Sequence, residues 1–282
     1  EMLRSLVGSE MCIRDSRVGA AVKNNEGEWV LLNGNQTALM FVYYLITRWK
    51  ELGKINGKEY IVKTIVTTET IKTIAERNGV EIYDVYTGFK WIANVMRENE
   101  GKKNYIGGGE ESYGFLCEDF VRDKDAVSAC VILAEIAAWA KDQGLSLYQL
   151  LQKIYVEYGF SKEKGISVVK KGKSGAEEIE AMMKKFRENP LTEIAGSKVT
   201  YFYDYSTLKG KDYAENETVT LDMPTTSNVL QYFTEDNTKV SIRPSGTEPK
   251  IKFYCEVHSK VKSIDELPEA EKAAEEKINQ IK

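Results

Sequence analysis

One segment of the sequence concentrates groups that can hold a phosphate: Arg243-Pro244-Ser245-Gly246-Thr247-Glu248-Pro249. It offers a guanidinium fork, two hydroxyls and a glycine amide that can approach an anion closely. The segment lies between two predicted strands, and its two prolines restrict the shape of the connecting loop. An ordinary hairpin turn is the alternative, because Pro, Ser and Gly are common turn residues. The local chemistry leaves both interpretations open.

A second segment, Gly107-Gly108-Gly109-Glu110-Glu111-Ser112-Tyr113-Gly114, follows a predicted strand as a glycine-rich turn with two carboxylates and a hydroxyl. Such groups suit a loop that binds sugar hydroxyls, and a solvated acidic turn is the alternative. The glycines lack the GxGxxG spacing of a dinucleotide site. In addition, the next predicted helix begins too late for such a site.

Two shorter segments precede predicted helices. Arg122-Asp123-Lys124-Asp125 contains two candidate caps for a helix N-terminus, Asp123 and Asp125, and this is compatible with a functional Lys124. Thr87-Gly88-Phe89-Lys90 lies where a strand ends and a helix begins. Ligands gather at such positions in α/β sheets, and a plain strand-to-helix turn is the alternative.

The elements that must position these segments begin as an α/β pattern. Strands and helices alternate from residue 60, which predicts βαβ units. The expected strands are 18–22, 29–32, 60–67, 80–86, 104–106 and 166–169, and the expected helices are 36–52, 69–77, 89–100, 125–143, 147–158 and 176–187.

The last third of the chain is richer in strands. They are expected over 198–205, 229–233, 239–242 and 250–257, before a charged helix over 264–281. This order predicts helices packed on an antiparallel sheet. Ser263 and Glu266 have capping-box spacing at the start of that helix. Asn189-Pro190 closes the preceding helix and indicates a domain boundary there.

Composition excludes several classes of protein. The 282 residues carry 39 Lys+Arg against 43 Asp+Glu, a net charge of −4 that argues against a nucleic-acid partner. The apolar runs at 38–46 and 126–140 are shorter than the roughly 20 residues of a membrane span. The four cysteines form no CxxC pair, and a single histidine cannot build a His-based zinc site. We therefore expect a cytoplasmic protein without a membrane partner, whose oligomeric state no sequence feature assigns.

Taken in order, the four segments resemble the α-D-phosphohexomutase family, most closely its phosphoglucomutase/phosphopentomutase branch. The resemblance covers nearly the whole chain from Arg17 to the C-terminus. It implies an α/β fold with one complete three-layer α/β domain, the tail of another, and a C-terminal α+β domain with helices on an antiparallel sheet. The corresponding ranges are 17–53 for the end of domain II, 54–192 for domain III and 193–282 for domain IV.

The resemblance also implies residue roles. Glu110 and Ser112 would contact sugar hydroxyls, and Thr87 and Gly88 would line the substrate loop. Lys124 would lie near the reacting phosphate, in a catalytic acid/base position. The clamp on the non-reacting phosphate would consist of Arg243, Ser245, Gly246 and Thr247. The implied ligand is a phosphosugar, and the implied reaction interconverts glucose 1-phosphate and glucose 6-phosphate through a phosphoserine and a sugar bisphosphate.

The sequence departs from the family at its metal loop. Family members carry Asp-x-Asp-x-Asp-Arg before a Val-Gly strand, whereas Cys12, Arg14 and Ser16 occupy the three aspartate positions here. None of these side chains replaces a carboxylate as a ligand for Mg²⁺. The magnesium ion and the sugar bisphosphate activator are therefore implied for the parent enzyme, whereas the metal ligands are absent from this chain.

The break in resemblance at residue 16 predicts that residues 1–16 are a leader foreign to the family, as an artefactual join would produce. We therefore expect a fragment that is inactive alone, from a gene that encodes a mutase. The alternatives are a non-catalytic phosphosugar-binding module, or a phosphopentomutase or phosphomannomutase as the parent enzyme.

Overall fold

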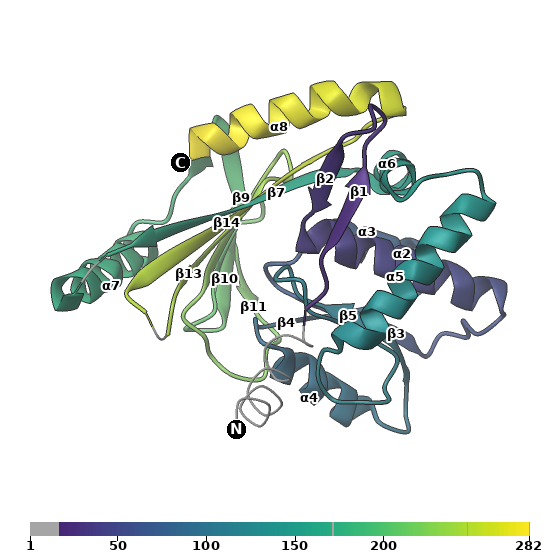
Figure 1. Ribbon diagram of the computed structural model, residues 1–282. Helices are drawn as coiled ribbons and strands as arrows, with labels where there is room; N and C mark the ends of the chain where they lie inside the picture. Colours follow the sequence, from purple (N-terminus) through teal and green to yellow (C-terminus); the bar gives the residue numbers. More distant parts are fainter. Residues whose placement is uncertain (1–16, 171, 247, 282) are drawn as a thin grey trace, which may run out of the picture. The chain divides into compact units, whose positions relative to one another are not determined.

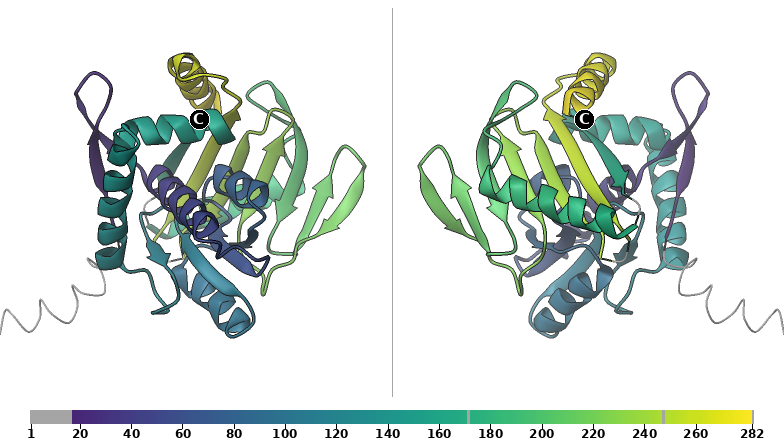
Figure 2. Two further views of the ribbon diagram at one scale, coloured as in Figure 1. Left: turned by 90° about the vertical axis from the view of Figure 1, so that its right-hand side faces the viewer. Right: turned by 90° about the vertical axis from the view of Figure 1, so that its left-hand side faces the viewer.

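A computed structural model of the chain describes residues 17–170, 172–246 and 248–281. The chain divides into two compact units, the first ending at Gly159 and the second beginning at Phe160. Figure 1 labels the helices and strands of both units, and Figure 2 gives two further views.

The first unit is built on a four-stranded sheet in the order β4-β3-β5-β6. Its strands are β3 (Glu59–Thr64), β4 (Glu81–Val85), β5 (Asn104–Gly109) and β6 (Phe115–Cys117). The first three are parallel, whereas β6 runs antiparallel to β5. All six residues of β3 are buried, as expected for a central parallel strand that is covered on both faces.

Helices cover both faces of this sheet and give the unit three layers (Figure 1). α4 (Phe89–Asn99) packs on the face that contains Leu116. α2 (Gly34–Glu51) packs on the opposite face, where Phe41 stacks on Phe115 with 4.5 Å between ring centroids. Adjacent residues of a strand point to opposite faces, so the two helices lie on different sides of β6. The other elements are β1 (Ala20–Lys23), β2 (Trp29–Leu32), α3 (Thr70–Arg77), α5 (Ala126–Asp142) and α6 (Leu147–Tyr158).

Three consecutive glycines, 107–109, belong to β5, although the sequence predicts a turn there. A Cβ on Gly108 would lie 2.5 Å from the carbonyl oxygen of Val62 and 2.7 Å from Tyr105 Oη. Glycine is therefore required in this strand because β3 and the Tyr105 hydroxyl occupy the space of a side chain. The expected strand 104–106 consequently continues to Gly109.

The second unit is built on an eight-stranded antiparallel sheet. Seven strands follow the order β11-β10-β9-β12-β13-β14-β7, and β8 pairs with β9. The strands are β7 (Phe160–Val169), β8 (Glu193–Ile194), β9 (Ser197–Asp204), β10 (Lys209–Asp212), β11 (Glu217–Thr220), β12 (Leu230–Thr234), β13 (Lys239–Pro244) and β14 (Lys250–Ser259). The short strands β6, β8, β10 and β11 are not predicted from the sequence.

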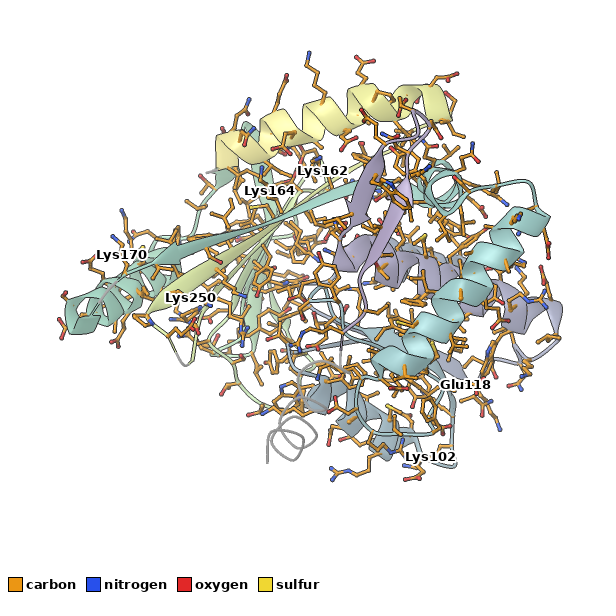
Figure 3. All side chains as sticks on the ribbon, viewed as in Figure 1. Lys102, Glu118, Lys162, Lys164, Lys170 and Lys250 are labelled. Atoms are coloured by element: carbon orange, nitrogen blue, oxygen red, sulfur yellow. The ribbon has the colours of Figure 1, made fainter. Side chains whose placement is uncertain are left out.

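Two helices, α7 (Gly172–Glu188) and α8 (Leu267–Ile281), pack on one face of this sheet. The ring of Phe186 on α7 meets that of Phe253 on β14, at 6.4 Å between centroids. Lys162 of β7 pairs with Glu271 of α8 at 2.8 Å, and Figure 3 labels Lys162 on its strand. Phe253 and Lys162 share a face, because Phe253 lies opposite Ile166 and residues of even spacing on a strand point the same way.

The predicted fold class is confirmed, because a three-layer α/β unit is followed by an antiparallel sheet with helices on it. The division of the chain differs from the predicted one. Residues 160–169 pair along their whole length with β14, and α7 packs on the same sheet, so residues 160–192 join the second unit. Similarly, α2 packs on the sheet of the first unit, although 17–53 is predicted as the end of a separate domain.

The caps of the helices also differ from the prediction. Ser263 forms no side-chain cap, and the Glu266 carboxylate accepts a hydrogen bond from the Lys262 amide at 2.7 Å. A 3₁₀ turn, η1 (Ile264–Glu266), therefore precedes α8. Full capping boxes occur instead at Asn33 on α2 and Ser146 on α6.

The glycine requirement in β5 predicts that Gly108→Ala lowers the free energy of unfolding by about 1–3 kcal/mol, the usual effect of overpacking a core. Gly165→Ala is the matched control, because Gly165 also lies in a strand and has no heavy atom near a built Cβ. Urea unfolding of both variants measures the difference. Equal stability of the two variants would show that the Val62–Tyr105 contacts do not select glycine.

Candidate functional site

The carboxyl ends of β3, β4 and β5 meet at one edge of the first sheet. β3 pairs in parallel with both neighbours, so Thr64 lies beside Val85 and Lys63 beside Gly109. Thr87 and Gly88 follow β4, and the loop that begins at Glu110 follows β5. Parallel α/β sheets bind ligands at this edge, because the loops there converge.

Glu110 is the centre of this edge. Its side chain is buried, and Oε1 accepts a hydrogen bond from the Gly88 amide at 2.9 Å. Gly88 has a φ of 113°, which favours glycine, and it is the N-cap residue of α4. The amide of Glu110 in turn donates to the Gly114 carbonyl oxygen at 2.8 Å. The structure thus brings together two of the predicted residues, Gly88 and Glu110, which follow β4 and β5, the two strands that flank β3.

Lys124 and the same carboxylate both lie close to Gly114. A Cβ on Gly114 would lie 2.8 Å from Lys124 Cδ and 3.1 Å from Glu110 Oε2. The Lys124 side chain is only 15% exposed, and its Nζ lies 3.1 Å from Asp123 Oδ1 and 5.6 Å from the centroid of the Phe89 ring. A cation held among a carboxylate and an aromatic face can donate hydrogen bonds to an anionic ligand.

Asp125 fixes the direction in which this segment enters α5. Its carboxylate accepts hydrogen bonds from the amides of Val127 at 3.2 Å and Ser128 at 3.1 Å, so Asp125 is the cap and Asp123 pairs with Lys124. Burial opposes the ionisation of Asp125, but the hydrogen bonds from Ser128 and Val127 outweigh it and lower its pKa below the ordinary value.

The loop between Glu110 and Gly114 is held against α2. A Cβ on Gly34 would lie 2.0 Å from the Glu111 carbonyl oxygen, so only glycine permits this approach. The Val18 amide donates to the Tyr113 carbonyl oxygen at 3.0 Å, and Tyr113 itself has a left-handed φ of 69°. Ser112, the remaining predicted residue of the loop, is half-buried between these anchors.

Several polar residues at the end of β3 are not among the predicted site residues. Thr64 Oγ1 donates to Glu111 Oε2 at 3.2 Å and lies 2.8 Å from Thr67 Oγ1, and the Thr68 amide donates to Asn35 Oδ1 at 3.0 Å. All three threonines are fully buried. The signal in the sequence is a run of threonines directly after a buried strand, where buried hydroxyls need partners.

Lys63 is a further buried polar residue at this edge. Its Nζ lies 2.7 Å from Asp84 Oδ1 and 3.0 Å from Glu69 Oε1, and its side chain is 1% exposed. Its position inside an apolar strand hides it from pattern analysis. The parallel pairing of β3 with β4 explains the contact, because it sets Lys63 directly beside Asp84.

The predicted phosphate loop lies in the second unit, between β13 and β14. The Ser245 amide donates to the Lys250 carbonyl oxygen at 2.8 Å, and the Glu248 amide donates to Ser245 Oγ at 3.3 Å. The Lys170 amide binds the Pro249 carbonyl oxygen at 2.9 Å, which ties the loop to the end of β7; Figure 3 labels Lys170 and Lys250. These bonds give the loop a closed shape.

Arg243 supplies the main charge of this loop. It lies on β13 directly opposite Lys252 of β14, and it forms no ion pair with any residue that the structure describes. Gly246 is exposed, with no heavy atom within 4 Å of a built Cβ. Thr247 lies outside the described residues. The loop therefore presents a half-buried guanidinium beside a second cation and an exposed glycine, which suits an anion.

The predicted site residues consequently form two groups, one in each unit. Within residues 17–170, 172–246 and 248–281, no group of three His, Cys, Asp or Glu side chains is arranged to hold a metal ion. Cys12, Arg14 and Ser16, at the metal positions implied by the resemblance, lie outside the described residues. In the same part of the chain, no helix has the length and apolar character needed to cross a membrane.

Two family models match this sequence. Residues 33–158 match "Phosphoglucomutase/phosphomannomutase, alpha/beta/alpha domain III", and residues 167–274 match "Phosphoglucomutase/phosphomannomutase, C-terminal domain". The first match lies within the first unit and the second within the second unit.

Among curated proteins, a phosphoglucomutase of Staphylococcus aureus is 37% identical over 238 residues, which cover 84% of this chain and 42% of the relative. A phosphoglucomutase of Staphylococcus haemolyticus is 33% identical over 242 residues, or 86% and 43% of the two chains. The chain therefore spans less than half the length of these relatives.

Solved structures show the same fold. Parafusin, a phosphoglucomutase from Paramecium, has a TM-score of 0.56 at 16% identity and matches over 88% of this chain and 40% of its own. A putative phosphomannomutase from Thermus thermophilus has a TM-score of 0.53 at 16% identity, over 96% and 50%. At these identities the likeness concerns the fold alone.

The cap at Asp125 predicts a pH-dependent contribution to stability. Because folding lowers the pKa of Asp125, its contribution is fully present above the ordinary pKa of 3.8 and is lost as the pH falls through the folded-state value. We expect Asp125→Asn, which keeps a capping oxygen, to be less stable than the parent chain at pH 7 by about 0.3–1 kcal/mol.

Urea unfolding between pH 7 and pH 2.5 measures this effect. The difference between the parent chain and Asp125→Asn should shrink below pH 3.8. Asp125→Ala is the control, because it removes the capping oxygen as well and should lose about 1 kcal/mol at neutral pH. A difference that stays constant across this range would contradict the assignment.

Proposed function

Because the chain belongs to the phosphoglucomutase/phosphomannomutase family, the α-D-phosphohexomutases, we propose that it supplies the sugar-binding and phosphate-binding parts of a phosphoglucomutase. The chain contains two candidate sites with different chemistry, one in each unit, and this combination supports the proposal. The unit that matches domain III holds the buried Glu110 against Gly88, and the unit that matches the C-terminal domain presents Arg243 in a closed loop.

The proposed reaction is the interconversion of glucose 1-phosphate and glucose 6-phosphate. A phosphoserine of the whole enzyme transfers its phosphoryl group to the free hydroxyl of the sugar, leaving serine and a sugar bisphosphate. The bisphosphate turns around, and its other phosphoryl group returns to the serine. Phosphoryl transfer of this kind depends on positioning and charge neutralisation, which loops of these two types provide.

In this proposal the first unit binds the sugar. Glu110 accepts hydrogen bonds from sugar hydroxyls through the oxygen that faces Gly114, while Ser112 adds a hydroxyl from the same loop. Thr87 and Gly88 line the substrate loop. Lys124 lies near the Glu110 carboxylate. From there its cation would neutralise the reacting phosphate and act in proton transfer at the reacting end of the sugar.

The second unit binds the phosphate that does not react. Arg243 supplies a guanidinium, Ser245 a hydroxyl and Gly246 an open amide, and Thr247 completes the loop. Hydrogen bonding to hydroxyls and phosphate oxygens suits an intermediate that must bind in two orientations, because neither loop has to match one shape of the sugar.

The proposal for the parent enzyme includes a magnesium ion and a sugar bisphosphate activator. A metal ion would neutralise charge on the phosphoryl group that moves. The donor set of this chain does not fit one, since Cys12, Arg14 and Ser16 offer no carboxylate. A cytoplasmic location is part of the proposal, and the free thiols of Cys117, Cys130 and Cys255 suit a reducing compartment.

We expect Arg243→Ala to weaken the binding of glucose 1-phosphate by roughly tenfold, because a charge-assisted contact to phosphate is lost. Equilibrium dialysis with radiolabelled sugar phosphate measures the effect. Lys184→Ala is the control, since that exposed lysine lies in the same unit on α7. Unchanged binding in Arg243→Ala would contradict the role of this loop.

We also expect the purified chain to bind glucose 1-phosphate without converting it to glucose 6-phosphate, because its metal-loop positions carry no carboxylate. A coupled assay with added magnesium measures conversion, and the Staphylococcus aureus phosphoglucomutase serves as the positive control. Sustained turnover that depends on magnesium would overturn this expectation.

A further inference from the structure

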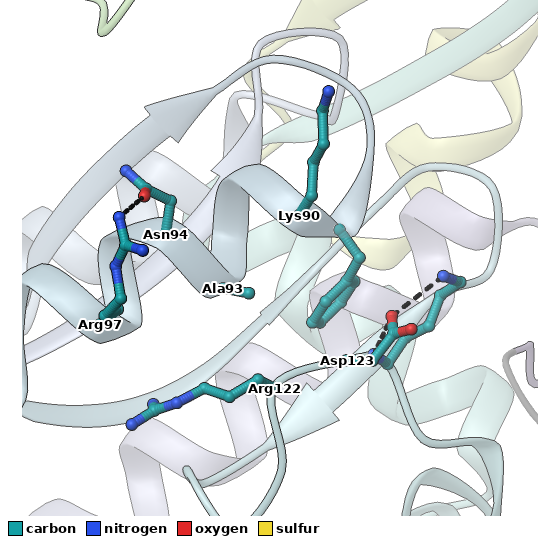
Figure 4. A pocket seen from close by; sticks show the side chains of 8 residues that line it. Lys90, Ala93, Asn94, Arg97, Arg122 and Asp123 are labelled. Atoms are coloured by element: carbon teal, nitrogen blue, oxygen red, sulfur yellow. Dashed lines mark hydrogen bonds and ion pairs between the residues drawn. The ribbon is translucent and has the colours of Figure 1, made fainter.

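A cavity of about 550 Å³ lies in the first unit, beside the loop from Glu110 to Gly114. One wall is a face of α4, and the other is the segment that leads into α5. Its lining residues are Phe89, Lys90, Ala93, Asn94, Arg97, Arg122, Asp123 and Lys124. Figure 4 shows Ala93 facing the space between the two walls, with Arg97 and Arg122 toward one end and Asp123 toward the other.

The charge of this cavity is strongly positive. Four of its lining side chains are cations and one is a carboxylate. Arg97 donates to the neutral Asn94 Oδ1 at 2.8 Å and forms no ion pair with a described residue. Arg122 pairs at 2.9 Å with Glu100, whose side chain is 66% exposed. Exposed ion pairs of this kind contribute little to stability, so an incoming anion can compete for Arg122.

The cavity also has an apolar part, formed by Ala93 and the edge of the buried Phe89. A bare anion would contact only the end of the cavity formed by Arg97 and Arg122, here called the arginine end. A ligand with a carbon skeleton can also contact the apolar part. The chemistry that fits both parts is a small phosphorylated metabolite, because a phosphate accepts two or more hydrogen bonds from guanidinium groups.

The arginine end is distinct from the contact between Gly88 and Glu110. Gly88 caps the N-terminus of α4, whereas Arg97 lies nine residues further along the same helix. At a rise of 1.5 Å per residue this spacing is roughly 13 Å along the helix axis. A phosphate held by Arg97 therefore lies outside the contact that Glu110 makes.

We propose that this cavity is a second anion site, which binds the phosphate group of a small phosphomonoester between Arg97 and Arg122, with the carbon skeleton of the ligand against Ala93 and Phe89. The site goes beyond the proposed mutase function. It uses residues of the first unit only, and it neither requires nor replaces the Arg243 loop.

The test uses the full chain labelled with ¹⁵N-arginine and titrated with inorganic phosphate or glucose 6-phosphate, at constant ionic strength. Each arginine side-chain signal is assigned by its loss in the corresponding alanine variant. We expect saturable shifts of the Arg97 and Arg122 signals. The Arg48 signal is the internal control, because Arg48 is an exposed arginine outside the cavity that pairs with Glu51. Shifts that do not saturate, that occur equally at Arg48 or that chloride reproduces would overturn the proposal.

Three variants test whether Arg97 and Arg122 bind the same phosphate. Arg97→Ala should weaken phosphate binding at Arg122 by roughly fivefold, and Glu100→Gln should strengthen it by roughly two- to threefold, because a competing carboxylate is removed. Arg243→Ala should leave the Arg97 and Arg122 shifts unchanged, so failure of this site and failure of the proposed function are distinguishable. Unaltered affinity in both Arg97→Ala and Glu100→Gln would also overturn the proposal.

Discussion

The first unit depends on close backbone packing around the loop from Glu110 to Gly114. At Gly34 the N-terminus of α2 approaches the Glu111 carbonyl so closely that a β-carbon cannot fit. At Gly114 the side chains of Lys124 and Glu110 occupy the space that a β-carbon would need. These contacts join α2, the carboxyl edge of the sheet and the segment before α5. Glu110 is buried and directed at the Gly88 amide because the loop has no room to move away.

The second unit constrains its loop in a different way, through an antiparallel ladder. β14 pairs with β13 on one side and with β7 along ten residues on the other, and the loop closes by main-chain bonds at Ser245 and Pro249. Four residues before Arg243 on the same strand, Lys239 forms a buried ion pair with Glu256 at 2.9 Å. A buried pair opposes any shift of register, because a slip would leave both charges without a partner.

The two constraints suit different tasks. A buried carboxylate with one oxygen engaged by an amide retains its second oxygen for a neutral hydroxyl, which favours a sugar. An arginine beside a lysine, where the paired strands β13 and β14 meet their connecting loop, favours the binding of a phosphate. The cavity along α4 extends this logic, since Arg97 contacts a neutral amide and Arg122 an exposed carboxylate. An anion in this cavity would lie near the loop from Glu110 to Gly114 and would not contact Gly88, the residue that binds the Glu110 carboxylate.

The sequence by itself determined most of the element types and which polar groups the loops could offer. Helical periodicity located the helix 147–158 at its observed bounds, and the alternation of strands with helices gave the α/β class of the first unit. The composition of the loop that begins at Arg243 was compatible with an anion site and with an ordinary hairpin turn, and only the resemblance to the family favoured the anion. Periodicity and composition are local properties, so a single chain segment is sufficient to display them.

Tertiary structure decided everything that depends on neighbours distant in the sequence. The sequence of glycines 107–109 predicts a turn, whereas in the structure they continue β5, and at Gly108 Val62 and Tyr105 fill the space of a side chain. Residues 160–169 belong to the second unit because β14, some ninety residues later, is their partner. Likewise, the buried threonines after β3 and the contact of Lys63 with Asp84 follow from the parallel pairing of strands. Such pairings are set by the packing of the whole domain, and the local pattern of residues does not contain them.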